Sequence, residues 1–401
     1  MLSHPEQLAR LEAAVPEVAH TAVVAGDPCY DRMLVSLDRR ARYRRKFGVT
    51  GDRKLIVVSS TWSPDSLLGT WPDLVRQLLA ELPVDEYQVA AIMHPNIWQG
   101  HGPWQLRTWL ADSVRAGLAL IPPVEGWRAA LIAADCVIGD NGATTCYGAA
   151  LGRPTLLAAF PHDNVASGSP VDVLGTLAAE LDARRPLRAQ IDDAISIHRP
   201  GTFARVASLV TSEPEQSPRL LRGLFYRVMG LSEPRGEPML PPIPHDGLPG
   251  TPPRPTATTV GVRFGPDGVR LTRYPAEVQA HALFPPDTSD HHLVSHVDHP
   301  GRVLRSIADV LFCYETELDE PAAEWLAANR PVCEIIAVVG TDSTLLRTDD
   351  GQHAELIGPI PDAYASIAYQ WLADGKSLRE LPATLTVHIG PRSDEVAIRV
   401  W

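Results

Sequence analysis

The stretch Asp135–Pro154 reads DCVIGDNGATTCYGAALGRP and combines a short apolar run, a small polar turn and a helical segment closed by Gly152. If residues 136–139 form a buried strand, the turn 140–144 lies at its carboxyl end. The following helix then directs its unpaired N–H groups at whatever occupies that end, and phosphate is the usual occupant. An ordinary strand-to-helix junction, capped by Thr144 or Thr145, fits the same letters. The neighbouring segments decide between the two.

Apolar strands alternate with helices around this stretch. Continuous apolar strands joined by helices predict an α/β fold, a Rossmann-like doubly wound parallel sheet covered on both faces. We take the strand order as 3-2-1-4-5, which places strands one and four side by side. The predicted strands are 55–58, 88–93, 118–121, 136–139 and 154–160; helices are predicted at 72–82, 104–116 and 127–134 and within the stretch itself.

Polar residues gather where these strands end. Ligands of doubly wound sheets bind at the carboxyl ends of the strands, where the strand order reverses. The loops at this edge carry hydroxyls, a glycine turn and two imidazoles, whereas the opposite edge shows no such concentration. This asymmetry favours a nucleotide or phosphate site, with the candidate binding residues Ser59, Ser60, Thr61, Asn141, Gly142, Thr144, Thr145 and His162.

His94 and Asp140 are the candidate catalytic residues. His94 precedes Pro95, which holds the residue before it extended and so fixes where the ring lies. Contact with a phosphate or stabilisation of charge suits it, and a structural His-Pro turn is the alternative. Asp140 can hold a ribose hydroxyl or a substrate amine, or it can order the turn by accepting a hydrogen bond from Gly142.

Composition limits the class of protein. Lys and Arg number 36 against 48 Asp and Glu, and the net charge of −12 argues against a nucleic-acid partner. The amino terminus has no leader pattern, and no segment approaches about 18 uninterrupted apolar residues, so we expect a cytoplasmic protein without a membrane span. The five cysteines lack Cys-x-x-Cys spacing and are expected to be buried thiols. Trp62, Trp98, Trp104, Trp109 and Trp127 are expected to pack helices against the sheet.

A run of histidines raises the question of a metal. Five of them fall between His281 and His299. The Pro, Ser and Asp residues around them indicate a solvated loop, and neither zinc-type spacing nor a paired cysteine is present. We therefore predict no metal and no cofactor.

Proline marks a linker. Nine of the 23 residues from Glu233 to Pro255 are proline, which excludes a helix or a central strand. We expect a Rossmann-like domain over 1–230, a semi-rigid linker over 231–255 and a smaller α+β domain of unknown role over 256–401. Hairpins are predicted there around Gly265–Gly268 and Asp349–Gly351, with apolar strands at 310–313 and 332–339.

Several short motifs together resemble the carboxyl-terminal half of GT-B-type transferases. They are His4-Pro5-Glu6-Gln7-Leu8, Ala25-Gly26-Asp27-Pro28, Ser59-Ser60-Thr61-Trp62, Met93-His94-Pro95-Asn96 and Ala134-Asp135 through Asp140. Proteins of actinobacteria related to CDP-glycerol glycerophosphotransferases are the most similar, and the UDP-N-acetylglucosamine 2-epimerase group is more remote. In such enzymes the second Rossmann-like domain holds the nucleotide donor. The resemblance implies that His94 and the turn 140–145 contact the donor diphosphate or the transferred group.

The resemblance also implies a function. It is that of a nucleotide-donor-binding transferase domain, moving a glycosyl or glycerophosphate group from a CDP- or UDP-activated donor. Because the matching motifs start at His4, we expect a partner protein to supply the acceptor domain. The alternatives are a catalytically degenerate binding or regulatory module and a sugar-nucleotide epimerase-like enzyme.

Overall fold

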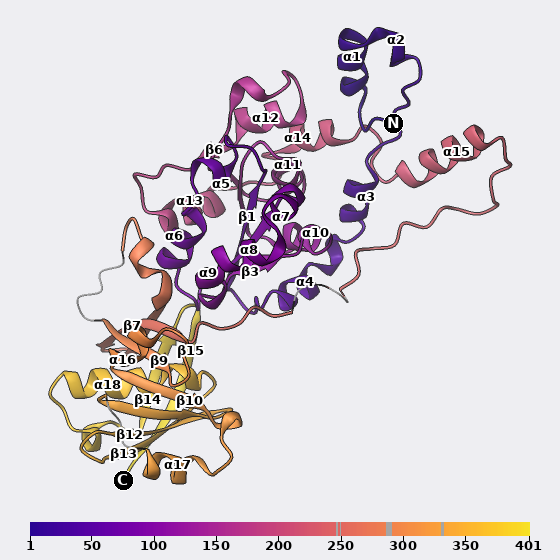
Figure 1. The fold of residues 1–401 in the computed structure, drawn as a ribbon. Coiled ribbons are helices and arrows are strands. Elements are labelled where there is room, and N and C mark those ends of the chain that lie inside the picture. Colours follow the sequence, from indigo (N-terminus) through magenta and orange to yellow (C-terminus); the bar gives the residue numbers. More distant parts are fainter. Residues whose placement is uncertain (246–247, 249, 286–290, 330–332) are drawn as a thin grey trace. The chain divides into compact units, whose positions relative to one another are not determined.

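The structure, a computed structural model, describes residues 1–245, 248, 250–285, 291–329 and 333–401 (Figure 1). The chain divides into two compact units. The first comprises residues 1–75, 88–110 and 118–252. The second comprises residues 76–87, 111–117 and 253–401.

A six-stranded parallel sheet of order β3-β2-β1-β4-β5-β6 forms the base of the first unit. The Rossmann-like sheet and the predicted order of its first five strands are confirmed. The helix predicted at 127–134 is also present. A sixth strand was missed, because α12 ends at Leu177 and the chain then pairs with β5. The strands are β1 (Lys54–Ser60), β2 (Tyr87–Met93), β3 (Ala119–Ile121), β4 (Cys136–Gly139), β5 (Thr155–Leu157) and β6 (Ala179–Glu180).

Short helices connect and flank these strands, and many of them begin at proline, whose fixed φ suits the first turn. The long helix predicted over 104–116 is interrupted at Leu110. The helices are α1 (Pro5–Ala14), α2 (Pro16–Ala19), α3 (Pro28–Leu34), α4 (Arg40–Lys46), α5 (Leu67–Thr70), α6 (Leu74–Glu81), α7 (Pro95–His101), α8 (Pro103–Trp109), α9 (Ala111–Arg115), α10 (Trp127–Ala133), α11 (Ala143–Ala150), α12 (Pro170–Leu177), α13 (Leu187–Ile197), α14 (Ala204–Val210) and α15 (Ser217–Met229).

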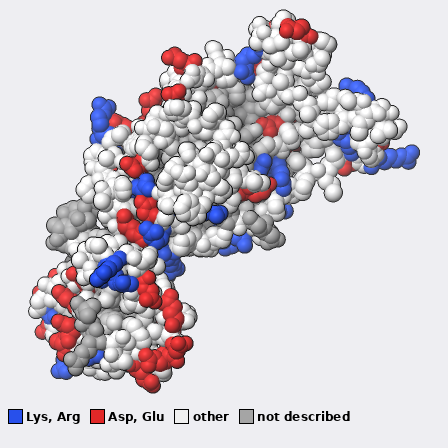
Figure 2. All heavy atoms as spheres, viewed as in Figure 1, with Lys and Arg blue, Asp and Glu red and all other residues white. Residues whose placement is uncertain are grey.

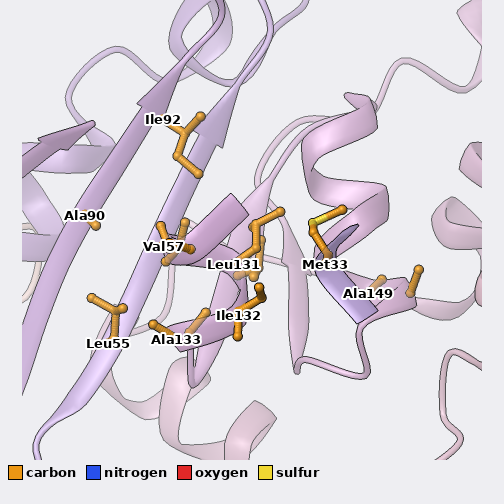
Figure 3. Close-up of a cluster of buried hydrophobic side chains, with 14 of the residues drawn as sticks. Met33, Leu55, Val57, Ala90, Ile92, Leu131, Ile132, Ala133 and Ala149 are labelled. Carbon is orange, nitrogen blue, oxygen red and sulfur yellow. The ribbon is translucent and has the colours of Figure 1, made fainter. Parts of the chain in front are cut away.

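The core of the first unit lies between the sheet and the helices on one of its faces (Figure 3). Leu55 and Val57 of β1 and Leu131 of α10 are fully buried there. Burying one such side chain contributes about 1.5–3 kcal/mol. Because β1 and β4 are buried along nearly their whole length, the loops that follow them are held in a fixed place.

One residue of the proline-rich segment belongs to this core. Ile243 is only 1% exposed and packs with the buried side chains of the first unit. Its N–H donates to Ser36 Oγ (2.9 Å), and its carbonyl accepts from Tyr43 OH (2.6 Å). Residues 231–245 contain neither helix nor strand, as predicted, but this anchor was not foreseen.

The second unit contains a closed barrel of order β10-β11-β12-β13-β15-β14-β8-β7-β9. The prediction of an α+β unit did not include this closure. Both predicted hairpins are confirmed, and β11 begins at Ile335; Val332, where that strand was predicted to begin, lies outside the described residues. The strands are β7 (Ala257–Gly265), β8 (Gly268–Pro275), β9 (His291–His296), β10 (Val310–Tyr314), β11 (Ile335–Val339), β12 (Ser343–Thr348), β13 (His353–Ile357), β14 (Thr384–Ile389) and β15 (Arg392–Val400), with helices α16 (Arg302–Ser306), α17 (Ala322–Ala328) and α18 (Ala365–Ala373).

The histidine-rich segment was wrongly predicted as a solvated loop. Residues 291–296 form β9, and His292 and His299 are buried. His296 Nε2 lies 2.8 Å from Glu317 Oε2, and His299 Nε2 lies 2.7 Å from Glu277 Oε1. Across the described residues, no three His, Cys, Asp or Glu side chains are grouped so that they could hold a metal ion.

Two other predictions about single residue types are partly corrected. Three of the five free cysteines are buried, while Cys29 and Cys333 are half-buried. Trp98 is buried as expected, but Trp62, Trp104 and Trp109 are 60%, 79% and 46% exposed, because they lie on short helices or loops at the surface. Of the helices in the described ranges, none has the length and apolar character needed to cross a membrane.

Candidate functional site

Asp140 joins the loops that follow β1 and β4. The side chain is completely buried at the carboxyl end of β4. Asp140 Oδ2 accepts hydrogen bonds from Thr61 N–H (2.7 Å), Thr61 Oγ1 (2.8 Å) and Leu67 N–H (3.0 Å). Asp140 Oδ1 accepts from Gly142 N–H (3.1 Å). The carboxylate thus orders the turn in the way that the sequence left as one of two alternatives, and it also fixes the first loop.

Gly142 lets the two loops approach closely. It is the N-cap of α11, and no side chain caps this helix. A Cβ at this position would lie 2.7 Å from Thr61 Cγ2 and 3.0 Å from Asp140 Oδ1. A larger residue would therefore push the loops apart.

The first turn of α11 offers hydrogen-bond donors. Within the described part of the chain, no acceptor contacts the backbone N–H groups of Ala143, Thr144 or Thr145. Unpaired N–H groups and the helix dipole together give the amino end of a helix about half a positive charge. This end of α11 is therefore suited to an anion.

A pocket of about 350 Å³ adjoins the start of α11. This volume is in the range of small-molecule sites. Its walls come from the start of α11, from the amino-terminal segment and from the loop before α12, and they mix polar and apolar side chains. The lining residues are Ser3, Gln7, Arg10, Asp27, Asn141, Ala143, Cys146, Tyr147, Asn164, Val165, Ala166, Ser169, Pro170, Val171 and Val210.

The amino-terminal segment reaches the pocket through backbone pairing. Leu2 forms a parallel bridge with Val24, which places Ser3 beside the loop that leads into α3. Arg10, on α1, supplies a cation at the pocket and is ion-paired with Glu6. Residues 4–8 carry one of the motifs found in the sequence, but no role was predicted for them. A pairing between short segments about 20 residues apart leaves no pattern that would have predicted this wall.

Asp27 and Tyr147 both line the pocket and are hydrogen-bonded to each other. Asp27 caps α3 by accepting from Cys29 N–H (2.8 Å) and Tyr30 N–H (3.0 Å). Its second oxygen accepts from Tyr147 OH at 2.6 Å. Burial, followed by the negative charge of Asp27, raises the pKa of Tyr147, so the phenol keeps its proton. Neither residue was predicted as a site residue.

His94 lies one strand beyond Thr61, outside the residues that line the pocket. It caps α7, with the ring Nδ1 accepting from Asn96 N–H at 3.1 Å. The backbone N–H of His94 donates to the carbonyl of Ser60 at 3.1 Å. Because Nδ1 is an acceptor, the neutral ring carries its proton on Nε2. The ring is half-buried, with its centroid 6.5 Å from that of the exposed Trp62. His94 can therefore offer an Nε2–H donor.

The other predicted residues form two groups. Those in the loops after β1 and β4 lie close together, and His162 lies apart from them. Ser59 and Ser60 are buried, and Ser60 Oγ serves the loop by accepting from Leu68 N–H at 3.1 Å. Thr145 is fully buried, packed on Gly139. The structure thus brings Ser60, Thr61, Asp140, Gly142 and the start of α11 together, with Asn141 and Ala143 open to the pocket.

His162 lies apart from this group. It is exposed on a short 3-10 helix, residues 162–164, and its Nε2 is 3.7 Å from Glu180 Oε1. Its ring packs edge-on against Phe160, with centroids 4.8 Å apart. Asn164 lines the pocket and His162 does not. The loop after β5 thus reaches the pocket through Asn164, and the role predicted for His162 stays a prediction.

Comparison with known proteins gives remote structural matches only. No protein-family model matches the sequence, and no curated protein sequence matches it. Among solved structures, the wall teichoic acid polymerase TagF soaked with CDPG matches 57% of this chain at 14% identity, with a TM-score of 0.41. MnaA of S. aureus with UDP matches 58% at 12% identity (TM-score 0.33), and the UDP-GlcNAc 2-epimerase of Methanocaldococcus jannaschii matches 53% at 14% identity (TM-score 0.33). The matched parts span 56%, 61% and 58% of those chains.

Proposed function

We propose that the chain contains a GT-B-like transferase domain that binds a nucleotide-activated donor, in which the glycosyl or glycerophosphate group to be transferred is linked to CDP or UDP. One observation carries the proposal: the uncapped start of α11 opens on a pocket of about 350 Å³ that also holds the cation Arg10. A diphosphate needs several N–H donors and a positive charge, and this corner of the sheet supplies both.

The residues take different roles in this proposal. The N–H groups of Ala143 and Thr144, with Arg10, bind the diphosphate, and the polar side chains on the pocket walls hold the nucleoside. The transferred group extends across Thr61 towards His94, since two strand spacings of about 4.8 Å each separate β4 from β2. There His94 Nε2–H donates to the charge that develops on the leaving group, which is the nucleoside diphosphate when a sugar is transferred and CMP when glycerol phosphate is transferred from CDP-glycerol. Asp140 is a positioning residue.

A second candidate, a binding module without catalysis, is favoured by the state of Asp140. Its carboxylate already accepts four hydrogen bonds and is completely buried, so it is not free to act as a general base. In that case the chain would hold the nucleotide for a partner protein. The partner that we propose for transfer is one that supplies an acceptor domain, because both substrates must be positioned together.

Calorimetry tests the donor site. CDP, UDP, CDP-glycerol and UDP-N-acetylglucosamine are titrated into the intact chain, the Gly142→Val variant and the Gly100→Val variant. Gly142→Val should weaken binding at least tenfold, because its side chain would displace the loop at Thr61 and with it the start of α11. A Cβ at Gly100 meets nothing within 4 Å, so this control should bind like the parent chain.

An independent variant avoids the packed turn. Arg10→Ala removes an exposed side chain and should weaken diphosphate binding by about tenfold, the usual worth of a charge-assisted hydrogen bond. His94→Asn should leave the binding constant unchanged while lowering any transfer or donor hydrolysis. No heat with any nucleotide at millimolar concentration would reject the donor site. Binding without turnover in the presence of an acceptor domain would establish the second candidate.

A further inference from the structure

Helix α15 is an unusual element of the first unit. Its thirteen residues, Ser217–Met229, read SPRLLRGLFYRVM, and only Ser217 is buried. The start of the helix is fixed by the fully buried Asp31, whose Oδ1 accepts from Glu215 N–H (2.7 Å) and whose Oδ2 accepts from Ser217 N–H (3.0 Å) and Ser217 Oγ. The remaining turns lie at the surface (Figure 1).

The helix has one apolar half and one cationic half. At 100° per residue, the apolar side chains fall on one side of the axis and the three arginines on the other. The helix contains no Asp or Glu, although the chain as a whole has a net charge of −12. The apolar half consists of Leu220, Leu221, Leu224, Phe225, Val228 and Met229; the cationic half carries Arg219, Arg222 and Arg227.

The outer part of the apolar half is open to solvent, while Leu220, Leu221 and Leu224 are half-buried. Phe225, Val228 and Met229 are 48%, 78% and 54% exposed, and Leu231, just past the helix, is 60% exposed. Figure 2 shows white surface over α15 with blue Lys and Arg atoms, and some red atoms, beside it. Leaving several large apolar side chains in water is unfavourable and marks an interaction surface.

We propose that α15 lies in the interface of an anionic lipid bilayer, with its apolar half among the acyl chains and its arginines at the lipid phosphates. A broad apolar face bordered by cations is the signature of a helix that lies in a membrane surface. Arg222 is ion-paired with Glu233, so Arg219 and Arg227 supply most of the attraction to an anionic surface. Because the chain as a whole is acidic and repelled by such a surface, the cationic helix determines which side approaches.

The breadth of the apolar face and its charged border together argue for lipid over a protein groove. A helix in a groove buries a narrow row of anchors at positions i, i+3, i+4 and i+7, and α15 has such a row in Leu221, Leu224, Phe225 and Val228. The apolar half extends to either side of that row, at Leu220 and Met229, and continues beyond the helix at Leu231, with arginines at its border. A bilayer covers a face of that breadth without needing a matching partner surface. The proposal is independent of the donor site, since none of these residues lines the pocket.

Vesicle co-sedimentation tests the proposal with a matched pair of variants. The intact chain is mixed with vesicles of phosphatidylcholine alone or with two-fifths phosphatidylglycerol. Val228→Asp puts a charge on the apolar half of α15, and Val124→Asp puts one at an equally exposed valine, at 77%, in a loop of the same unit. Circular dichroism and thermal melting check that both variants fold.

The parent chain and Val124→Asp should partition onto the anionic vesicles at least tenfold more strongly than onto phosphatidylcholine. Val228→Asp should lose that preference by tenfold or more, Arg219→Glu with Arg227→Glu should abolish it, and 0.5 M salt should weaken it because exposed charges are screened. Equal binding to both kinds of vesicle, equal loss in both valine variants, or no binding at all would overturn the proposal; the last result would assign the face to a protein.

Discussion

The parallel sheet of the first unit and the barrel of the second treat buried polar groups in opposite ways. At the sheet edge, Asp140 organises two loops so that the donors of α11 stay unpaired beside a pocket. In the barrel unit, the buried ring of His299 is instead paired with the carboxylate of Glu277. A parallel sheet collects distant loops at one edge, where chemistry can be placed. The pair of His299 and Glu277 in the barrel unit instead satisfies both side chains within the fold.

We expect the largest effect from a substitution that removes the carboxylate of Asp140. Asp140→Ala leaves the N–H groups of Thr61, Leu67 and Gly142 without their acceptor at a buried site. Each lost partner of a buried donor costs about 1–3 kcal/mol. We expect the free energy of unfolding of the first unit to fall by about 3–5 kcal/mol, measured by urea denaturation.

An exposed carboxylate serves as the control. Asp163→Ala, on the 3-10 helix after β5, should change stability by no more than about 0.5 kcal/mol. Equal effects of the two substitutions would show that Asp140 does not organise the edge, and its four hydrogen bonds would then have no energetic weight.

A second pair of variants tests whether the barrel is closed. Gly268 and Gly351 both have positive φ in hairpins, at +124° and +88°. A Cβ at Gly268 would collide with the carbonyl of Thr386 on β14, whereas a Cβ at Gly351 meets nothing within 4 Å. Gly351→Ala should cost about 1–2 kcal/mol from backbone strain alone. Gly268→Ala should cost about 1–3 kcal/mol more, because β8 and β14 must separate.

Equal costs at the two glycines would mean that β8 and β14 are not held together. The barrel would then be an open sheet, with its strands still connected through the pairing of β9 with β10. Thermal unfolding followed by near-ultraviolet circular dichroism distinguishes the two results.

The smallest expected effect concerns His292, whose two ring nitrogens are buried without a hydrogen-bond partner in the described part of the barrel. Burial, with a smaller contribution from His291, lowers the pKa of His292 to about 3. The folded state therefore keeps the ring neutral while the unfolded state takes up a proton below about pH 6.5. Stability is full above that pH and falls towards pH 3, by at most about 1.4 kcal/mol per pH unit.

His292→Leu should flatten this pH dependence between pH 6.5 and 3. At pH 7 it should stabilise the unit by about 1 kcal/mol, because unpaired buried nitrogens are removed while the contact with Tyr369 is lost. The exposed His20→Leu should show neither change. An unaltered slope in the His292 variant would mean that the ring is hydrated in the folded state.

The parallel sheet could be predicted because the signals for its strands and helices lie in short stretches of sequence. Each of the first five strands of the first unit lies in a largely apolar run that a helical segment follows, and right-handed crossovers then leave few orders possible. β6 was missed because two residues, Ala179 and Glu180, form no pattern. The barrel closes through the parallel pairing of β8 with β14 and of β9 with β10, between segments that no short-range signal connects. The polar residues of β9 hid its character as a strand.

Only the part of the candidate site that residues 140–150 form was predictable from the sequence. The glycine turn and the helix after it are readable in residues 140–150, and Asn141 and Gly142 lie where expected. The role of Asp140 was ambiguous in the sequence, because an acidic residue after a strand can bind a ligand or accept structural hydrogen bonds. Its complete burial, which only the structure shows, separates the two roles. Arg10, Asp27 and Tyr147 reach the pocket through tertiary contacts, which the sequence does not display.

The burial of Ile243 has a practical consequence for dissecting the chain. A fragment that stops after Gly230 would contain every strand and helix of the first unit and would still leave a gap where Ile243 packs. Tyr43 OH would lose its acceptor, and Ser36 Oγ would lose a donor. An expressible fragment should therefore run to Pro252, where the first unit ends. Through Ile243, the proline-rich segment thus packs into the core and holds the end of the first unit against it.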